Sequence, residues 1–298
     1  SDTLYPGVYN PNLKWEETTT WNVGLDMGWW NNRLTVALDW YLRQSKDLLS
    51  YIAVAPGSTT TNMLDQNIGT LENIGLEATI GAKPIVTDNF TWSTSYNVAW
   101  NRNKITKLNN EGTYVTTGGI TGAIGNTCQV HQVGYPAYSF MLYEQVYDEN
   151  GRPIEGCYVD QDGNGQIDSN DLVIKHHKDP TVTMSWNNSF SWNNWDLGIQ
   201  FRASIGNYVY NNVLAGNSSL SRMYQNGLNN LVRTDNYFDG SDNYLSDYWL
   251  ENAGFVRCDN ITLGYTWSDL IDGNLRLRLY GAVQNPFVIT KYRGIDPE

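Results

Sequence analysis

The sequence has few charged residues, few histidines and few cysteines. Only 17% of its 298 residues are charged, where a soluble domain usually carries about 25%. With 3 histidines and a net charge of −12, the chain does not suit duplex DNA, because phosphate contacts need clustered Lys and Arg. The cysteines, Cys128, Cys157 and Cys258, form no CxxC pattern, so neither a zinc cage nor a redox motif is predicted. We expect them to be reduced and unpaired.

Long apolar runs are also missing. No stretch approaches the roughly 18 apolar residues of a membrane helix, and no basic and then apolar start predicts a signal peptide. Lys, Glu and Ala are scarce, while Asn, Thr and Gly are plentiful, which favours strands and turns over helices. The 12 Trp and 20 Tyr argue against disorder. A membrane barrel stays possible, because it spans with alternating strands.

Apolar and polar residues alternate strictly in eight segments. In the first, Trp21, Val23 and Leu25 share one face, and Asn22 and Gly24 share the other. The eight segments are 21–29, 34–43, 74–81, 90–101, 182–192, 195–205, 260–267 and 275–284. Short turns join them in pairs, which predicts four antiparallel hairpins.

The connections between the hairpins are long, at about 25, 78 and 49 residues, whereas the turns within them are short, as in outer-membrane barrels. Trp29, Trp192 and Trp267 lie beside the short turns, where an interfacial aromatic girdle would place them. A soluble antiparallel sandwich also alternates, but its strands cluster near 5–6 residues, and loops beyond about 15 residues are uncommon in compact domains. The pattern therefore predicts an all-β fold, a segment of a transmembrane antiparallel β-barrel.

The sequence is expected to be part of a larger barrel. An eight-stranded barrel is filled by side chains, but the polar face here is rich in Gly, Ser and Asn. Residues 285–298 are predicted to be loop and not a closing strand, and residues 1–12 resemble the middle of a longer chain.

Several short motifs in a fixed order resemble those of the SusC/RagA family of TonB-dependent outer-membrane transporters. They are LKWE at 13–16, TTT at 18–20 with the hairpin at 21–49, NIG at 67–69, ENIGLE at 72–77, GYP at 134–136, and the segments 158–171, 257–264 and 277–298. None of them is a catalytic fingerprint, but together they span nearly the whole chain.

The resemblance implies a 22-stranded barrel with long extracellular loops, occluded by an amino-terminal plug, in the bacterial outer membrane. Residues 1–298 would be the carboxy-terminal part of the barrel domain, with a long loop at 103–180; the plug and the final strands are absent from this sequence. It also implies import of oligosaccharides or peptides, energy from the TonB complex, and a SusD-like surface lipoprotein as partner.

Residues 160–171 match an EF-hand-type calcium loop. The predicted Ca2+ ligands are Asp160, Asp162, Asn164, Asp168, Asp171 and the backbone carbonyl of Gln166. Gly165 occupies the sharp turn, and Ile167 is expected to be a buried anchor. Asp171 replaces the usual Glu, which makes bidentate closure weaker. No helical pattern flanks the loop, so the ion would staple it; a plain Asp/Gly turn is the alternative.

Other candidate sites are weaker. His176 and His177 with Asp179 lack the spacing of a zinc site, and His131 is isolated. Arg33, Arg202, Arg276 and Arg278 are expected to face the lumen. Loop aromatics could stack on sugar rings, but packing of the loops on each other or on a partner is favoured for most of them. They are Tyr135, Tyr138, Phe140, Tyr143, Tyr208, Tyr210, Tyr224, Tyr237, Tyr244, Tyr248 and Trp249.

The function expected from these observations is nutrient import through a SusC-type barrel, without catalysis by this chain. The alternative is a surface β-rich binding module or adhesin that does not transport. A barrel-embedded hydrolase would need a nucleophile with a base in reach, and the sequence shows no such motif.

Overall fold

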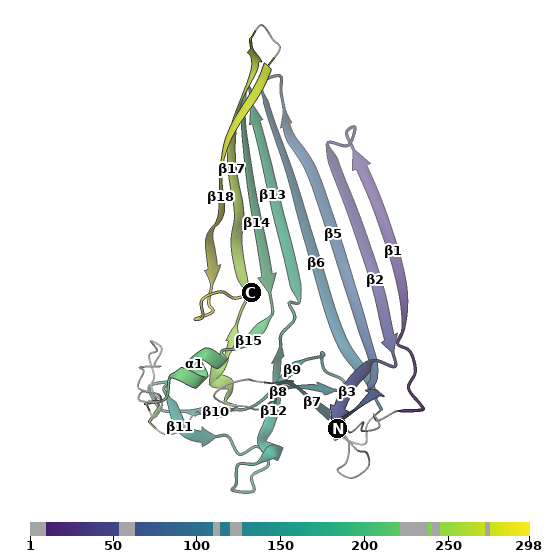
Figure 1. Ribbon diagram of the computed structural model, residues 1–298, viewed down its shortest axis with the longest axis vertical. Coiled ribbons are helices and arrows are strands. Elements are labelled where there is room, and N and C mark those ends of the chain that lie inside the picture. Colours follow the sequence, from purple (N-terminus) through teal and green to yellow (C-terminus); the bar gives the residue numbers. More distant parts are fainter. Residues whose placement is uncertain are drawn as a thin grey trace, which may run out of the picture.

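In the computed structural model, the described residues are 10–53, 63–109, 114–119, 127–220, 238–239, 245–271 and 275–298. Eight antiparallel strands form one long curved sheet, in which neighbours along the chain are neighbours in space (Figure 1). They are β1 (Glu17–Trp29), β2 (Leu34–Lys46), β5 (Gly69–Val86), β6 (Phe90–Leu108), β13 (Val182–Trp192), β14 (Trp195–Ile205), β17 (Phe255–Leu270) and β18 (Leu275–Thr290). The four predicted hairpins are confirmed.

The last strand is longer than predicted. β18 continues to Thr290, although the sequence indicates loop after Gln284. Its register against β17 changes between the pairs Cys258–Phe287 and Asn260–Gln284, and Asn285 has a φ of 47°. This bulge interrupts the alternation and so hides the end of the strand.

One face of the sheet is apolar across all eight strands. Val23, Trp40, Leu76, Trp100 and Val182 lie side by side on consecutive paired strands. Most of the large apolar side chains on this face are exposed, Val23 by 66% and Leu76 by 49%. Soluble monomers rarely expose continuous apolar surface of this extent, so the face is suited to lipid. No α-helix among the described residues has the length and apolarity needed to cross a bilayer.

The opposite face is polar and built partly from small residues. Next to the apolar row run Asp39, Glu77, Ala99 and Thr183, again on consecutive strands. In a closed barrel this face would line the lumen.

Gly75 leaves room on the polar face for the ring of Tyr41. Asn101 Nδ2 donates to the Tyr41 hydroxyl at 2.6 Å, and a Cβ at Gly75 would meet Tyr41 Cε1 at 2.6 Å. We expect Gly75→Val to displace the ring and to destabilise the barrel by about 1–3 kcal/mol, as overpacking does. Gly198→Val is the control, because no atom lies within 4 Å of its added Cβ. Urea unfolding in detergent checks this, and equal midpoints for the two variants would contradict it.

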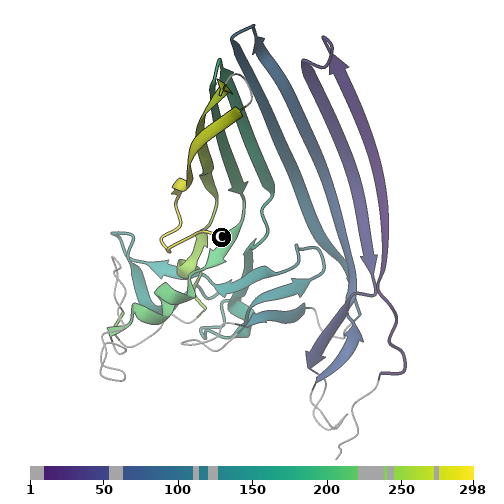
Figure 2. The same ribbon diagram turned by 45° about the horizontal axis from the view of Figure 1, so that its top comes forward.

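The long loops gather at one end of the sheet and contain small sheets of their own (Figures 1 and 2). β7 (Tyr114–Gly119), β8 (Thr127–Gln132), β9 (Ser139–Tyr143) and β12 (Leu172–His177) form a four-stranded sheet. Three two-stranded pairs are β3 (Leu49–Ala53) with β4 (Met63–Asn67), β10 (Gln145–Tyr147) with β11 (Pro153–Tyr158), and β15 (Tyr208–Tyr210) with β16 (Leu250–Asn252). The short helices are η1 (Ser169–Asp171), α1 (Asn212–Asn217) and η4 (Asp247–Trp249).

The loops share one apolar core, which we call the loop core. Its buried members are Cys128, Phe140, Leu142, Tyr210, Leu214, Ala215, Phe238, Leu245 and Trp249. Packing, the favoured prediction for the loop aromatics, is confirmed for Phe140, Tyr210 and Trp249, whereas Tyr135 and Tyr138 are exposed. Tyr224, Tyr237 and Tyr244 lie outside the described residues.

Candidate functional site

The segment 160–171, which we call the acidic loop, connects β11 to β12 in the group of long loops. Its first half is wound by side chains that accept hydrogen bonds from the backbone. Asp160 Oδ1 accepts from the N–H of Gly163 at 2.7 Å, and Oδ2 accepts from that of Gly165 at 2.8 Å. These bonds lower the pKa of the Asp160 carboxyl, that from Gly165 most.

Two glycines make this winding possible. Gly163 has a φ of 72° and Gly165 a φ of 80°, a region that side chains with a Cβ rarely adopt. Between them, Asn164 accepts from the N–H of Gln166 through Oδ1 at 2.7 Å. The position of Gly165 at the sharp turn agrees with the expected loop pattern.

Asp171 closes the acidic loop. Its Oδ1 accepts from the N–H of Gln161 at 2.7 Å, and its Oδ2 accepts from that of Asp168 at 2.8 Å. The residue is fully buried. One carboxylate therefore holds both ends of the loop, although it lies at the position where the usual motif has a Glu.

Three of the predicted ligands come together. One carboxylate oxygen from each of Asp160, Asp162 and Asp171 lies within 4.8 Å of the others. Among the described residues, no Lys, Arg or His forms an ion pair with any of the three. The arrangement has the chemistry that a hard cation needs, because oxygen ligands converge and no cationic side chain in the described part of the chain pairs with them.

Two details differ from the simple loop pattern. Asp168 Oδ1 accepts from the N–H of Asn170 at 2.7 Å, capping η1 instead of joining the three carboxylates. The expectation of a buried anchor at Ile167 is wrong, since the side chain is 42% exposed. Strands β11 and β12 flank this loop in place of the two helices of an EF-hand, so the residue that those helices would bury stays partly exposed.

A network of polar side chains holds the strands next to the acidic loop in place. Gln145 Nε2 donates to the carbonyls of Ile154 and Cys157, and its Oε1 accepts from Ser246 Oγ at 2.7 Å. Lys175 Nζ lies 3.2 Å from Glu144 and 3.4 Å from an oxygen of Asp247. These contacts join the β10–β11 pair to residues a hundred positions later, a connection that local sequence patterns could not predict.

The remaining candidate residues make ring contacts, ion pairs and hydrogen bonds with their neighbours. His176 stacks on Tyr208 with ring centroids 3.6 Å apart, and His131 packs edge-on against Tyr138. The three cysteines are free, as expected. Arg278 pairs with Asp196 at the polar face, and Arg33 donates to the Lys83 carbonyl.

The profile of the family described as "TonB dependent receptor-like, beta-barrel" matches residues 1–285. The chain belongs to this family. The predicted location in the outer membrane, as part of a β-barrel that spans it, is thereby confirmed.

Known members agree with the finer resemblance. The chain is 45% identical to the TonB-dependent receptor SusC of Bacteroides thetaiotaomicron, with 100% of the chain and 31% of SusC aligned. It is 30% identical to a TonB-dependent receptor of Formosa agariphila, over 97% of the chain and 31% of that protein. It superposes on the RagAB peptide transporter with a TM-score of 0.77 and 26% identity, covering 97% of the chain and 33% of that structure. The predicted SusC/RagA resemblance is confirmed, and the chain spans about a third of these relatives.

Proposed function

We propose that the full-length protein containing this chain, here called the parent protein, is a TonB-dependent importer of the SusC type. The eight-stranded sheet is then part of the barrel wall, with its apolar face toward lipid and its polar face toward the lumen. The substrate is an oligosaccharide or a peptide, received on the long loops from a SusD-like lipoprotein. Energy would come from the TonB complex through parts of the parent protein outside this chain.

The observation that carries this proposal is the two-faced sheet in a chain of this family. In the described part of the chain, the structured loops gather on one rim of that sheet. The named relatives support it, since one is a receptor of the TonB-dependent class and another a peptide transporter. They are receptors and transporters, and we expect no catalysis by this chain.

Uptake by living cells tests the proposed import. We expect removal of the gene for the parent protein to abolish growth on one class of oligosaccharide or peptide. The intact gene should restore growth, but a copy without its TonB-contacting segment should not. Unchanged growth on every oligosaccharide and peptide supplied would contradict the proposal and favour a binding role without transport.

We further propose that the acidic loop binds Ca2+. Asp160, Asp162 and Asp171 would supply carboxylate oxygens, and Asn164 and the backbone carbonyl of Gln166 would complete the shell. Asp168 would ligate through a water or act by capping η1. The convergence of the three carboxylates supports this role, and the ion would staple the loop because no helices flank it.

Calcium affinity is the direct test of the acidic loop. Replacing Asp160 and Asp171 by asparagine removes two charges. Each side chain keeps one oxygen acceptor, so each loses one of its two backbone contacts. We expect the dissociation constant for Ca2+ to rise by more than about tenfold, as ligand charge sets affinity in such loops. Isothermal titration of the parent protein in detergent measures it.

The control for the calcium test is Asp148→Asn. Asp148 Oδ1 also accepts from backbone N–H groups, those of Asn150 and Arg152, but among the described residues Asp148 belongs to no cluster of converging carboxylates. Its replacement should leave Ca2+ affinity unchanged. Equal affinity in the wild type and in the Asp160/Asp171 variant, or no binding by the wild type, would refute the proposed site.

A further inference from the structure

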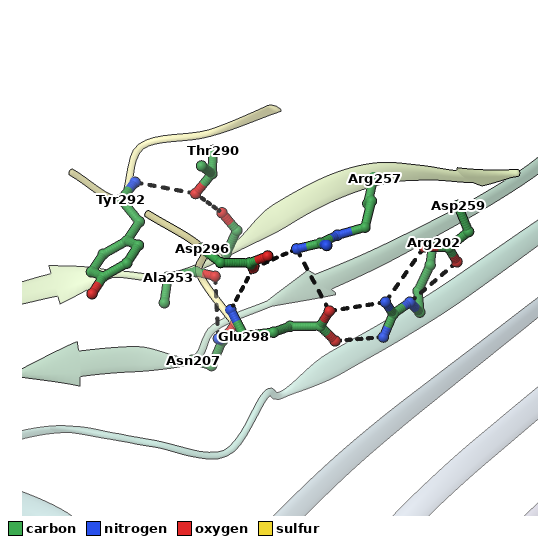
Figure 3. Close-up of polar contacts among 10 residues, drawn as sticks. Arg202, Asn207, Ala253, Arg257, Asp259, Thr290, Tyr292, Asp296 and Glu298 are labelled. Atoms are coloured by element: carbon green, nitrogen blue, oxygen red, sulfur yellow. Dashed lines mark hydrogen bonds and ion pairs between the residues drawn. The ribbon is translucent and has the colours of Figure 1, made fainter. Parts of the chain in front are cut away.

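After β18 the chain turns back across the polar face of the sheet. Residues 291–298, which we call the strap, end beside β14 and β17, as Figure 3 shows. Three strap side chains make ionic contacts: Arg293, Asp296 and Glu298.

Beneath the strap lie two arginines with the same charge. Arg202 on β14 and Arg257 on β17 are directly opposite each other in the strand register. Like charges so placed repel each other, and the Arg257 side chain is only 9% exposed. A buried guanidinium is costly unless carboxylates pair with it. Asp259 supplies a carboxylate to Arg202 alone, with Oδ2 3.3 Å from Nε.

The strap supplies the missing carboxylates. Glu298 Oε2 accepts from Arg202 at 2.9 Å and lies 3.6 Å from Arg257, so one carboxylate bridges the two guanidinium groups. Asp296 pairs with Arg257 as well (Figure 3). Even so, the buried Nε of Arg257 has no hydrogen-bond partner within the described part of the chain.

The strap is held mainly by these ionic contacts. The side chains of Asp296 and Glu298 are 47% and 41% exposed, and Ile295 is fully exposed. Only Pro297 is buried. Ion pairs with exposed carboxylates contribute little to stability, so another anion can compete for the arginines.

Space for a ligand adjoins the arginine pair. A cavity of about 390 Å³ lies against the same stretch of the sheet beside Arg202. Apolar residues such as Val98, Met184 and Phe255 line it together with polar side chains on neighbouring strands. The polar side chains include Glu77, Asn97, Ser185, Arg202 and Glu298. Asn97 Nδ2 donates to Ser185 Oγ at 2.9 Å, so hydrogen-bonding groups continue from the arginines across β13 and β6.

We propose that Arg202 and Arg257 form a carboxylate-binding site of the barrel wall, which the strap occupies until a carboxylate-bearing substrate displaces it. This inference rests on the proposed import function, because it assigns the polar face to the substrate path. The proposed substrate is therefore an acidic oligosaccharide with uronic acid units. Such a sugar carries carboxylates for the arginines and hydroxyl groups for the hydrogen-bonding side chains.

Release of the strap would also affect the loops, because Arg293 is connected to them by hydrogen bonds. Arg293 Nε donates to Glu251 Oε1 at 3.0 Å, and the N–H of Arg293 donates to Oε2 at 2.8 Å. The same Glu251 accepts from Asn211, whose side chain caps α1. The strap therefore joins the wall to α1, so a ligand at the arginines loosens a helix in the loop region.

Binding of trigalacturonic acid to the parent protein in detergent tests the site. The double variant Asp296→Asn/Glu298→Gln removes the competing charges while keeping side-chain size. We expect it to bind this acid at least about tenfold more tightly than the wild type does, and addition of Arg257→Gln should abolish the gain. Neutral maltotriose should bind the wild type and these variants alike. Asp196→Asn, which breaks the Arg278 pair elsewhere on the polar face, should leave acid binding unchanged.

Hydrogen exchange of the wild type is a second test, and it does not require any variant to fold. Trigalacturonic acid should speed exchange at the N–H groups of Arg293 and Glu298, and maltotriose should not. The proposal is overturned if the acid leaves hydrogen exchange unchanged. It is also overturned if Arg257→Gln does not weaken binding of the acid. Neither measurement uses TonB or uptake, so failure here leaves the import test unaffected, and failure of import leaves this binding result standing.

Discussion

Replacing Leu76 by arginine is expected to prevent assembly of the barrel in the outer membrane. Leu76 lies in the apolar row between Trp40 and Trp100, and 49% of it is exposed to the surroundings of the sheet. A guanidinium near the middle of a lipid-facing surface costs about 2–4 kcal/mol, a large part of the stability of a typical fold. The measurement is the fraction of protein recovered folded in the outer membrane, read from heat-dependent migration in detergent gels.

Thr79→Arg provides the control for the Leu76 substitution. Thr79 is on the same strand, but it lies on the polar face beside Asn97. An arginine there would project toward the predicted lumen, where charge is tolerated. We expect near-normal assembly of Thr79→Arg, and equal loss of both variants would show that the two faces do not differ in environment.

Replacing Trp249 by alanine is expected to unfold the loop core while leaving the barrel strands intact. Trp249 is fully buried and packs edge-on against Phe238 and Tyr248, with ring centroids at 5.5 and 4.7 Å. Truncating a buried Trp costs about 3–5 kcal/mol through lost burial and the remaining cavity. Hydrogen exchange should rise in α1 and in β9, which each contribute two side chains to this core, while the long strands keep their protection.

Trp15→Ala is the matched control, since Trp15 is 88% exposed. It removes the same side chain without opening a cavity, so exchange in the loops should not change. Equal exchange in the two variants would mean that the loop core does not hold the loops together. Loss of protection in β13 or β14 as well would mean that loops and barrel unfold as one unit.

Much of the long sheet could be predicted because each strand has one face toward lipid and the other toward the polar side of the sheet. The alternation from Trp21 onwards reports which side chains face lipid and which face the polar side, and it repeats often enough to reveal all eight strands. It failed where the backbone departs from a regular period. At Asn285 and Pro286 a bulge shifts the register, and the last residues of β18 were therefore predicted to be loop.

The small sheets of the loops were missed for a different reason. Residues 139–143 of β9 are almost all buried, so their sequence carries no alternation to read. A short buried strand of this kind is specified by its partners, and those of β9 are β8 and β12, the latter more than 25 residues away in sequence. The acidic loop was easier to predict from sequence than these small sheets and harder than the long strands. Its glycines and aspartates are close together along the chain, and its hydrogen bonds are local.

The sequence by itself determined the two-faced strands, their pairing into hairpins, the family and the chemistry of the acidic loop. Each depends on neighbours along the chain, or on a short turn that brings adjacent strands together. The three-dimensional structure was needed to show that Asp168 caps η1 while Asp171 joins the other carboxylates, and that Ile167 is exposed. It alone placed Glu298 between Arg202 and Arg257, because such a contact depends on the register of β14 and β17 and on the path of the chain after β18, neither of which a local pattern records.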